Sequence, residues 1–340
     1  MAELQDWMTR IKGAVDGCLE TYFAEKAEES KDISADSIEL LDGVRSLTMR
    51  GGKRFRPMMV EAGYRSVSPK GPADAALNAG AALEVLQSYL LIHDDWMDQD
   101  EERRGGPAVH VMYRDRYETH LADSLGILAG DLASAYALEL LCRSPFAASD
   151  LPKGLAIFLR IQKEVFFGQH LDITMNANVA RMHDLKTTSY TVRGPLLLGA
   201  SLGGASIEQS EALSAYAGPL GEAFQLADDL LGTFGDFATT GKPGNDLRNR
   251  KRNSLVSAAE ERLAPGERAP LDRVMGGEGS EADVTAATEL LVSSGAKAAV
   301  QAKLESQLAA AKTTLDGAPI SDEGRSLLFG LADRLALRSI

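Results

Sequence analysis

Two aspartates in the first half of the chain have the spacing of a metal site. Asp94 and Asp98 lie four residues apart at the end of an apolar segment, so their carboxylates point the same way on a helix. Gln87 precedes Asp94 by seven residues and falls on the same face. Neighbouring carboxylates repel each other in an apolar setting unless a cation or a proton lies between them. Hard oxygen ligands with open water positions suit Mg²⁺, above all when phosphate oxygens complete the coordination shell.

Other interpretations of this segment remain open at this point. A solvated acidic helix end is the alternative, because charge at the end of an apolar pattern commonly faces water. A Ca²⁺-binding EF-hand loop is excluded: counted from Asp94, the third position is Trp96 and the sixth is Gln99, where that loop requires glycine. His93, next to the acids, is more typical of a buried or supporting histidine than of a metal ligand.

A second acid pair repeats the arrangement later in the chain. Asp228 and Asp229 close another apolar segment, and Gln225 lies three and four residues before them on the same helical face. If both pairs faced one cavity, they would hold several divalent ions between them.

Three basic groups interrupt these acidic surroundings. Arginine forks and lysine point charges are common protein ligands of phosphates, and the amides of a glycine turn add to them. The groups follow Gly51–Gly52, the first acid pair and the second acid pair; they comprise Lys53, Arg54 and Arg56, then Arg103 and Arg104, then Lys242, Arg248, Arg250, Lys251 and Arg252. Surface charge is the alternative for any single one, but beside the acid pairs they predict a diphosphate site with two anion pockets.

The segments that carry these residues have the periodicity of helices. Leu83, Leu86, Leu90 and Met97 recur at helical offsets, whereas the alternation typical of strands is nearly absent from the chain. Stretches rich in glycine, proline and charge predict loops between helices, at residues 66–72, 101–107, 143–154, 234–252 and 265–279. We therefore expect one all-α domain over residues 1–340.

Composition argues against several other classes of protein. The 340 residues include 49 acidic and 36 basic side chains, and the formal charge of −13 disfavours a general nucleic-acid-binding protein. Two distant cysteines, Cys18 and Cys142, favour neither a disulfide scaffold nor a zinc site. The charged N-terminus is unlike a secretory signal, and the longest uncharged stretch, Gly194–Ile207, is too interrupted to span a bilayer. We expect a cytoplasmic protein without a membrane span.

In their order along the chain, the motifs resemble those of the trans-isoprenyl diphosphate synthases, also called polyprenyl synthetases. The first aspartate-rich motif of that family, Asp-Asp-x-x-Asp, matches residues 94–98. The basic glycine turn precedes it, and Lys186-Thr187 and Phe224-Gln225-x-x-Asp228-Asp229 follow in the expected order. The motifs extend from Gly51 to Val256, and the ordered set is highly specific.

The resemblance implies an all-α isoprenoid synthase fold with a deep central cavity, assembled as a homodimer. It implies a transferase that condenses isopentenyl diphosphate with an allylic diphosphate by ionisation, condensation and elimination. Three Mg²⁺ ions per active site would be held by Asp94, Asp98 and Asp228, with Asp95 and Asp229 as further catalytic acids. The allylic diphosphate would be bound by Arg103, Lys186, Gln225 and Lys242, and isopentenyl diphosphate by Lys53, Arg56, Arg104 and Gln87. Thr187 and Gln225 would face the carbocation, and Lys251 is a further candidate for substrate binding.

The chain departs from the family pattern after the second acid pair. The fifth place of the second motif, often aspartate, is Gly232, and Asp236 follows four residues later. Residues 241–246 form a segment one residue shorter than usual, and residues 250–253 read Arg-Lys-Arg-Asn where Gly-Lys-x-Thr is typical. These departures leave the roles of Asp246 and Lys251 open but keep the main metal ligands.

Residues before the first acid pair are expected to limit product length. Leu90 lies one helical turn before Asp94 on the same face, so a product chain that descends the cavity would meet it. The importance of Tyr89, the fifth residue before the motif, comes from the resemblance. Tyr89 and Leu90 together most resemble the corresponding residues of geranylgeranyl diphosphate synthases, with farnesyl diphosphate synthase as the alternative. A terpene cyclase or a non-catalytic partner subunit is less favoured, because Lys53, Arg56 and the metal ligands are retained.

Overall fold

The computed structural model describes residues 2–174, 178–235 and 246–336 and confirms the all-α prediction. The regular elements of these residues are helices, apart from one short antiparallel hairpin, β1 (Glu102–Arg103) paired with β2 (Gly106–Pro107). The chain divides into two compact units, and three helices contribute residues to both of them: α7 (Leu151–Ile173), α10 (Ile207–Phe234) and α16 (Asp322–Ala336).

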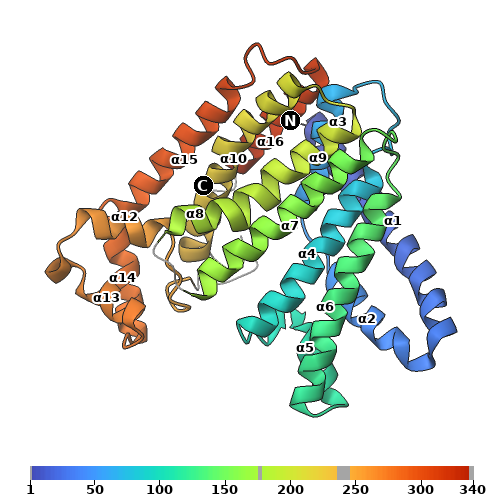
Figure 1. Cartoon of the computed structure of the whole chain (residues 1–340). Coiled ribbons are helices and arrows are strands. Elements are labelled where there is room, and N and C mark those ends of the chain that lie inside the picture. Colours follow the sequence, from blue (N-terminus) through green and yellow to red (C-terminus); the bar gives the residue numbers. More distant parts are fainter. Residues whose placement is uncertain (1, 175–177, 236–245, 337–340) are drawn as a thin grey trace. The chain divides into compact units, whose positions relative to one another are not determined.

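Unit 1 comprises Met1–Arg160, Gly194–Ser210 and Ile320–Leu327. Its other helices are α1 (Ala2–Ile33), η1 (Ala35–Ser37), α2 (Ile38–Met49), α3 (Phe55–Val67), α4 (Leu77–Met97), α5 (Val109–Met112), η2 (Tyr113–Asp115), α6 (Thr119–Cys142) and α9 (Gly194–Leu202). Helices α4 and α6 lie side by side (Figure 1), and α3 packs against α9.

Glycines set how closely the helices of unit 1 approach. On the α3–α9 contact, a Cβ at Gly63 would overlap the Leu196 carbonyl oxygen, and one at Gly199 would overlap the Val60 carbonyl oxygen. The two backbones therefore touch directly, which only residues without a side chain permit. The buried residues of α4 from Ala79 to Leu86 form part of the core of this unit.

Unit 2 comprises Ile161–Arg193, Glu211–Pro319 and Leu328–Ile340. Its other helices are α8 (Val179–His183), the π-helix η3 (Asp184–Arg193), α12 (Ser254–Arg262), η4 (Pro265–Glu267), α13 (Ala269–Gly276), α14 (Glu281–Ser293) and α15 (Ala296–Thr313). Helices α13 and α14 lie together (Figure 1), and α12 packs against α15. The Tyr216 hydroxyl on α10 donates to the Leu328 carbonyl at 2.7 Å, inside this core.

The predicted loop over residues 265–279 is wrong, because it contains η4 and α13. Pro265 and Pro270 lie in the first turns of these two helices, and Gly277 ends α13 in the left-handed conformation with φ 86°. Proline at a helix start and glycine just after its end are ordinary boundary signals. Here they enclose a helix so short that they resemble a loop in the sequence.

Helix α6 is, among the described residues, the one helix long and apolar enough to cross a membrane. It packs against α4 and α2 in unit 1, and its buried positions include Ala122, Gly126, Ala129 and Gly130. A core helix of a helical protein has the same length and composition, so α6 is weak evidence for a membrane span.

Candidate functional site

The first acid pair lies at the C-terminal end of α4, as predicted. Asp98 caps the helix, and its backbone N–H donates to the Asp94 carbonyl at 2.8 Å, so the two side chains lie one turn apart. Asp94 is partly exposed and Asp98 is exposed. Gln87 and Leu90 are also partly exposed and lie along the same side of the helix. This side of α4 therefore presents the predicted ligands and the predicted length-limiting leucine together.

Asp95 has the opposite environment from its neighbour Asp94. Its side chain is fully buried, and its Oδ1 accepts hydrogen bonds from Nε of Arg103, at 2.7 Å, and from Nη2 of the same guanidinium. No described residue donates to its Oδ2. Burial raises the pKa of the Asp95 carboxyl, and Arg103 opposes that rise. Arg103 also pairs with Asp100 at 3.1 Å, so Asp95 and Asp100 hold in place a guanidinium predicted to bind diphosphate.

The β1–β2 hairpin joins the first acid pair to the basic glycine turn. Nη1 of Arg104 donates to the Gly51 carbonyl at 2.8 Å, and Nη1 of Arg50 donates to the Arg103 carbonyl at 2.9 Å. Gly51 and Gly52 both have positive φ, 86° and 147°, so the turn depends on glycine at these positions. Two of the predicted basic groups therefore lie together in unit 1.

The three cations of the glycine turn have different environments. Lys53 is exposed and Arg56 is partly exposed. Arg54 is buried, and its guanidinium donates to Glu84 Oε2 at 2.6 Å and to Asp16 Oδ1 at 2.8 Å. The expectation that Arg54 belongs to the anion pocket is therefore corrected: this residue ties α1 and α4 to the start of α3. Its partners lie far away in the chain, so spacing alone did not reveal the pairing.

The second acid pair, in unit 2, shows the same contrast as Asp94 and Asp95. Asp228 on α10 is exposed, whereas Asp229 is buried. Asp229 accepts from Nε2 of Gln225 at 2.7 Å, and from the backbone N–H of Ser254, the first residue of α12, at 2.8 Å. Gln225 shares the face predicted for it, and the buried acid connects α10 to α12.

The departures from the family pattern meet at one place in unit 2. A Cβ at Gly232 would overlap the Asp246 carboxylate, so the glycine leaves the space that this carboxylate fills. Nδ2 of Asn253 donates to Thr233 Oγ1 at 3.0 Å and to Asp246 Oδ2 at 3.5 Å. Oδ1 of Asn253 accepts two backbone N–H groups of the first turn of α12, both at 3.1 Å. Position 232 often carries aspartate in the family. In this chain the Asp246 carboxylate, from the following segment, lies beside that position.

Arg250 replaces the typical glycine and keeps the backbone conformation that glycine favours. Its φ is 54°, in the left-handed region, which is costly for a residue with a Cβ. Its guanidinium lies against Gly277 after α13, and the nearby Arg248 pairs with Glu281 of α14 at 2.9 Å. These two arginines hold the segment after Asp246 against the α13–α14 pair.

Lys186 and Thr187 lie in the π-helix η3. A Cβ at Gly168 of α7 would lie 2.8 Å from the Lys186 backbone nitrogen, so glycine there allows the two helices to meet. Nζ of Lys186 lies 2.7 Å from Asp172 Oδ2. A π-helical turn widens the helix and occurs frequently at functional sites.

Lys251 and Lys242 are the remaining basic candidates for substrate binding. Lys251 is exposed, and its Nζ lies 4.0 Å from Asp246 Oδ1. Lys242 and Asp236 lie outside the described residues.

The donor set fits a metal ion that is bound partly by protein carboxylates and partly by a substrate. No cluster of three or more His, Cys, Asp or Glu side chains arranged for a metal occurs within residues 2–174, 178–235 and 246–336. Asp94 and Asp98 instead offer two hard oxygen donors one turn apart. Mg²⁺ keeps several waters and is commonly held by one or two carboxylates together with substrate phosphates.

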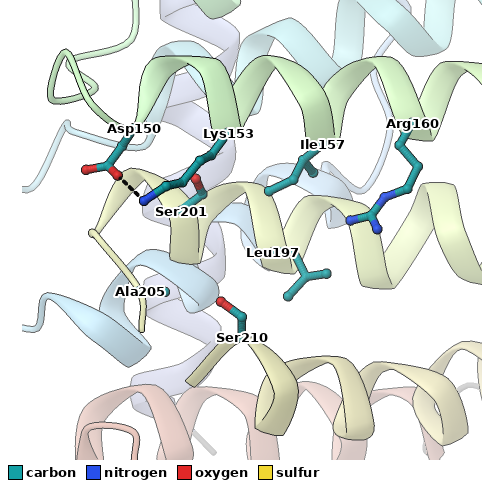
Figure 2. A pocket seen from close by; sticks show the side chains of 8 residues that line it. All are labelled: Asp150, Lys153, Ile157, Arg160, Leu197, Ser201, Ala205 and Ser210. Carbon is teal, nitrogen blue, oxygen red and sulfur yellow. Dashed lines mark hydrogen bonds and ion pairs between the residues drawn. The ribbon is translucent and has the colours of Figure 1, made fainter. Parts of the chain in front are cut away.

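A cavity elsewhere in unit 1 is separate from these residues. Figure 2 shows this space of about 150 Å³, lined by the first turns of α7 together with α9, with Lys153 paired to Asp150 at its edge. None of the predicted site residues lines it, so it has no assigned part in the reaction.

Comparisons with known proteins identify the family of the chain. The polyprenyl synthetase family model matches residues 39–291. A short-chain isoprenyl diphosphate synthase of Methanocaldococcus jannaschii is 32% identical over 274 residues, which cover 78% of this chain and 80% of that protein. A geranylfarnesyl diphosphate synthase of Aeropyrum pernix is 31% identical over 304 residues, 86% of this chain and 92% of that protein.

A solved structure supports the same assignment. The geranylgeranyl pyrophosphate synthase of Corynebacterium glutamicum, complexed with isoprenyl diphosphate and magnesium, superposes with a TM-score of 0.88 at 33% identity, covering 97% of this chain and 99% of that one. The chain therefore belongs to the polyprenyl synthetase family. It is a prenyltransferase, and its relatives place it among the short-chain isoprenyl diphosphate synthases.

Proposed function

We propose that the chain makes geranylgeranyl diphosphate by Mg²⁺-dependent condensation of isopentenyl diphosphate with an allylic diphosphate. Support comes from the aromatic Tyr89 and the partly exposed Leu90 before the first acid pair, and from the similar Corynebacterium synthase. Farnesyl diphosphate is the second candidate, because a shorter product would also be ended by residues placed before the first acid pair.

The observation that carries the proposal is a contrast between adjacent aspartates in each aspartate-rich motif, Asp94 with Asp95 and Asp228 with Asp229. In both motifs the first acid is open to solvent and the second is buried and hydrogen-bonded. Asp94, Asp98 and Asp228 would hold three Mg²⁺ ions, whose charge stabilises the leaving diphosphate as the allylic carbon–oxygen bond breaks. Asp95 and Asp229 serve the reaction by positioning Arg103 and Gln225.

The cations of this chain divide between the two substrates in the proposal. The allylic diphosphate is bound by Arg103, Lys186 and Lys242. Isopentenyl diphosphate is bound by Lys53, Arg56 and Arg104, with help from Gln87. Lys251 is a further positive charge for substrate binding. Arg103 and Lys186 are each held by a carboxylate, Asp95 and Asp172, so they are already oriented before substrate binds. Thr187 and Gln225 present oxygens to the allylic cation, and apolar walls keep water away from it.

The assembly and the location are also part of the proposal. We infer that the two units act as one domain over residues 1–340, that the protein is a homodimer, and that it works in the cytoplasm on diphosphate substrates. Analytical ultracentrifugation tests the assembly: a sedimenting mass near twice 36.4 kDa is expected, and a monomer at micromolar concentration contradicts it.

The deciding experiment measures the product directly. Purified protein is incubated with Mg²⁺, isopentenyl diphosphate and each of dimethylallyl, geranyl and farnesyl diphosphate, and the dephosphorylated products are identified by mass spectrometry. A twenty-carbon main product supports the proposal, and a fifteen-carbon one supports the farnesyl alternative. Cyclised hydrocarbon without elongation would indicate a terpene cyclase and overturn it.

A further inference from the structure

Tyr89, the residue expected to limit product length, is in contact with a second aromatic ring on the same helix. The rings of Tyr89 and His93 lie edge to face, with centroids 4.9 Å apart and planes at 71°. The two residues are one helical turn apart, and the contact has the favourable geometry of aromatic pairs. His93 therefore forms one wall of the space in which the Tyr89 ring rests.

Helix α6 fixes His93 from the other side. Nε2 of His93 lies 3.1 Å from the Ile127 carbonyl oxygen, and because a carbonyl can only accept, this nitrogen carries the hydrogen. Asp131 Oδ1 lies 3.8 Å from the same nitrogen. The imidazole thus has a hydrogen bond to one helix and a ring contact to another residue of its own helix.

Gly130 provides the room for this arrangement. A Cβ at position 130 would overlap Nε2 and Cδ2 of His93 and lie 3.2 Å from its Cε1. Any larger residue at 130 must push the imidazole out of its place against α6. A displaced imidazole would lose its hydrogen bond to the Ile127 carbonyl and change its contact with the Tyr89 ring.

We propose that His93 is a positioning residue that holds the Tyr89 ring and thereby sets product length, with Gly130 as the site on α6 that receives it. The inference rests on the proposed function, in which residues before the first acid pair limit the chain. It adds a determinant on a second helix, because the orientation of Tyr89 then depends on α6 as well as on α4.

Two glycines of α6 give a matched pair of variants. Gly130→Ala crowds His93, whereas Gly126→Ala, one turn earlier, crowds His110, whose Cβ would lie 2.7 Å from the new methyl group. Both add one methyl group at a tight histidine contact in the same helix. We expect Gly130→Ala to change the main product by about one five-carbon unit and Gly126→Ala to leave the product distribution as in the wild type.

Substitutions of His93 separate the ring contact from the hydrogen bond. His93→Phe keeps an aromatic ring beside Tyr89, and His93→Gln keeps a donor for Ile127. If ring contact positions Tyr89, His93→Phe retains the wild-type distribution while His93→Gln and His93→Ala shift it toward longer products. In a Tyr89→Ala background, His93→Ala should add no further shift, since the ring it positions is gone.

The outcomes distinguish this inference from the function on which it rests. Wild-type protein that does not elongate any primer overturns the proposed function. Wild-type protein that elongates, with an unchanged distribution in His93→Ala and Gly130→Ala, overturns the inference alone. Should Gly130→Ala fail to fold by circular dichroism, the His93 series decides. An additive shift in the double variant also contradicts the role of His93 as a support for Tyr89.

Discussion

Each aspartate-rich motif contains one buried aspartate, Asp95 in unit 1 and Asp229 in unit 2, and these two carboxylates are stabilised differently. Asp95 in unit 1 is matched by the charged guanidinium of Arg103, with one oxygen left without a described donor. Asp229 in unit 2 is matched on both oxygens by uncharged donors, the Gln225 amide and the N–H of Ser254 at the start of α12. A buried carboxylate can therefore be held by a counter-charge or by dipoles, and the two solutions should respond differently to mutation.

The largest expected effect is on turnover, and it distinguishes the exposed aspartates from the buried ones. Asp94→Ala and Asp228→Ala should each lower turnover by at least about 10²–10³-fold, because charge stabilisation of the leaving diphosphate is lost. Thermal unfolding should change little, since both side chains reach solvent. Removal of Mg²⁺ with a chelator should stop the wild type and be reversed by added Mg²⁺. Near-normal rates in Asp94→Ala would contradict the metal assignment.

The next effect tests the difference between the buried acids. Arg103→Leu leaves the buried Asp95 carboxylate without its cation and should lower the free energy of unfolding by about 3–5 kcal/mol. Gln225→Leu removes one uncharged donor from Asp229, which keeps the Ser254 N–H, and should cost about 1.5–3 kcal/mol. Urea denaturation measures both. Equal losses in the two variants would mean that the two environments are energetically alike.

Substitutions of Gly232 test the departure of unit 2 from the family pattern, in which position 232 is often aspartate. Gly232→Ala places a methyl group where the Asp246 carboxylate lies and should destabilise by about 1–3 kcal/mol. Gly232→Asp, which restores the family aspartate, adds a like charge and should be at least as harmful. The double variant Gly232→Asp with Asp246→Gly should recover activity relative to Gly232→Asp. No recovery would show that the two carboxylates are not interchangeable.

The smallest effect concerns Asn253. Asn253→Ala removes the cap of α12 and the donor to Thr233, with an expected loss of about 1–2 kcal/mol. Asn253→Thr, the typical family residue, keeps a capping oxygen and should cost only a few tenths of a kcal/mol. Differential scanning fluorimetry resolves the two. A Thr variant as unstable as the Ala variant would assign the stability to the Thr233 and Asp246 contacts instead of the cap.

Much of the helical architecture follows from the pattern of residues. Apolar offsets of three, four and seven predicted α4, and the spacing of Gln225 and Asp229 predicted a shared helical face, which lies on α10. The spacing of Asp94 and Asp98 predicted two side chains one turn apart on α4. The loop predicted over residues 265–279 was wrong because proline and glycine mark the ends of short helices as well as loops. Proline and glycine mark where a helix can begin or end. They do not show whether the few residues between them form a short helix or a loop.

Residue types and the helical repeat of about 3.6 residues were enough to predict the family, the all-α class and the helical faces that carry the acids and bases. Three features became visible only in the folded chain: the burial of Asp95 and Asp229, the internal ion pairing of Arg54, and the place of His93 between Tyr89 and α6. The physical reason is that desolvation and hydrogen bonding depend on neighbours from distant parts of the chain. Asp16, Glu84 and Gly130 have no local relation to the residues whose environments they set.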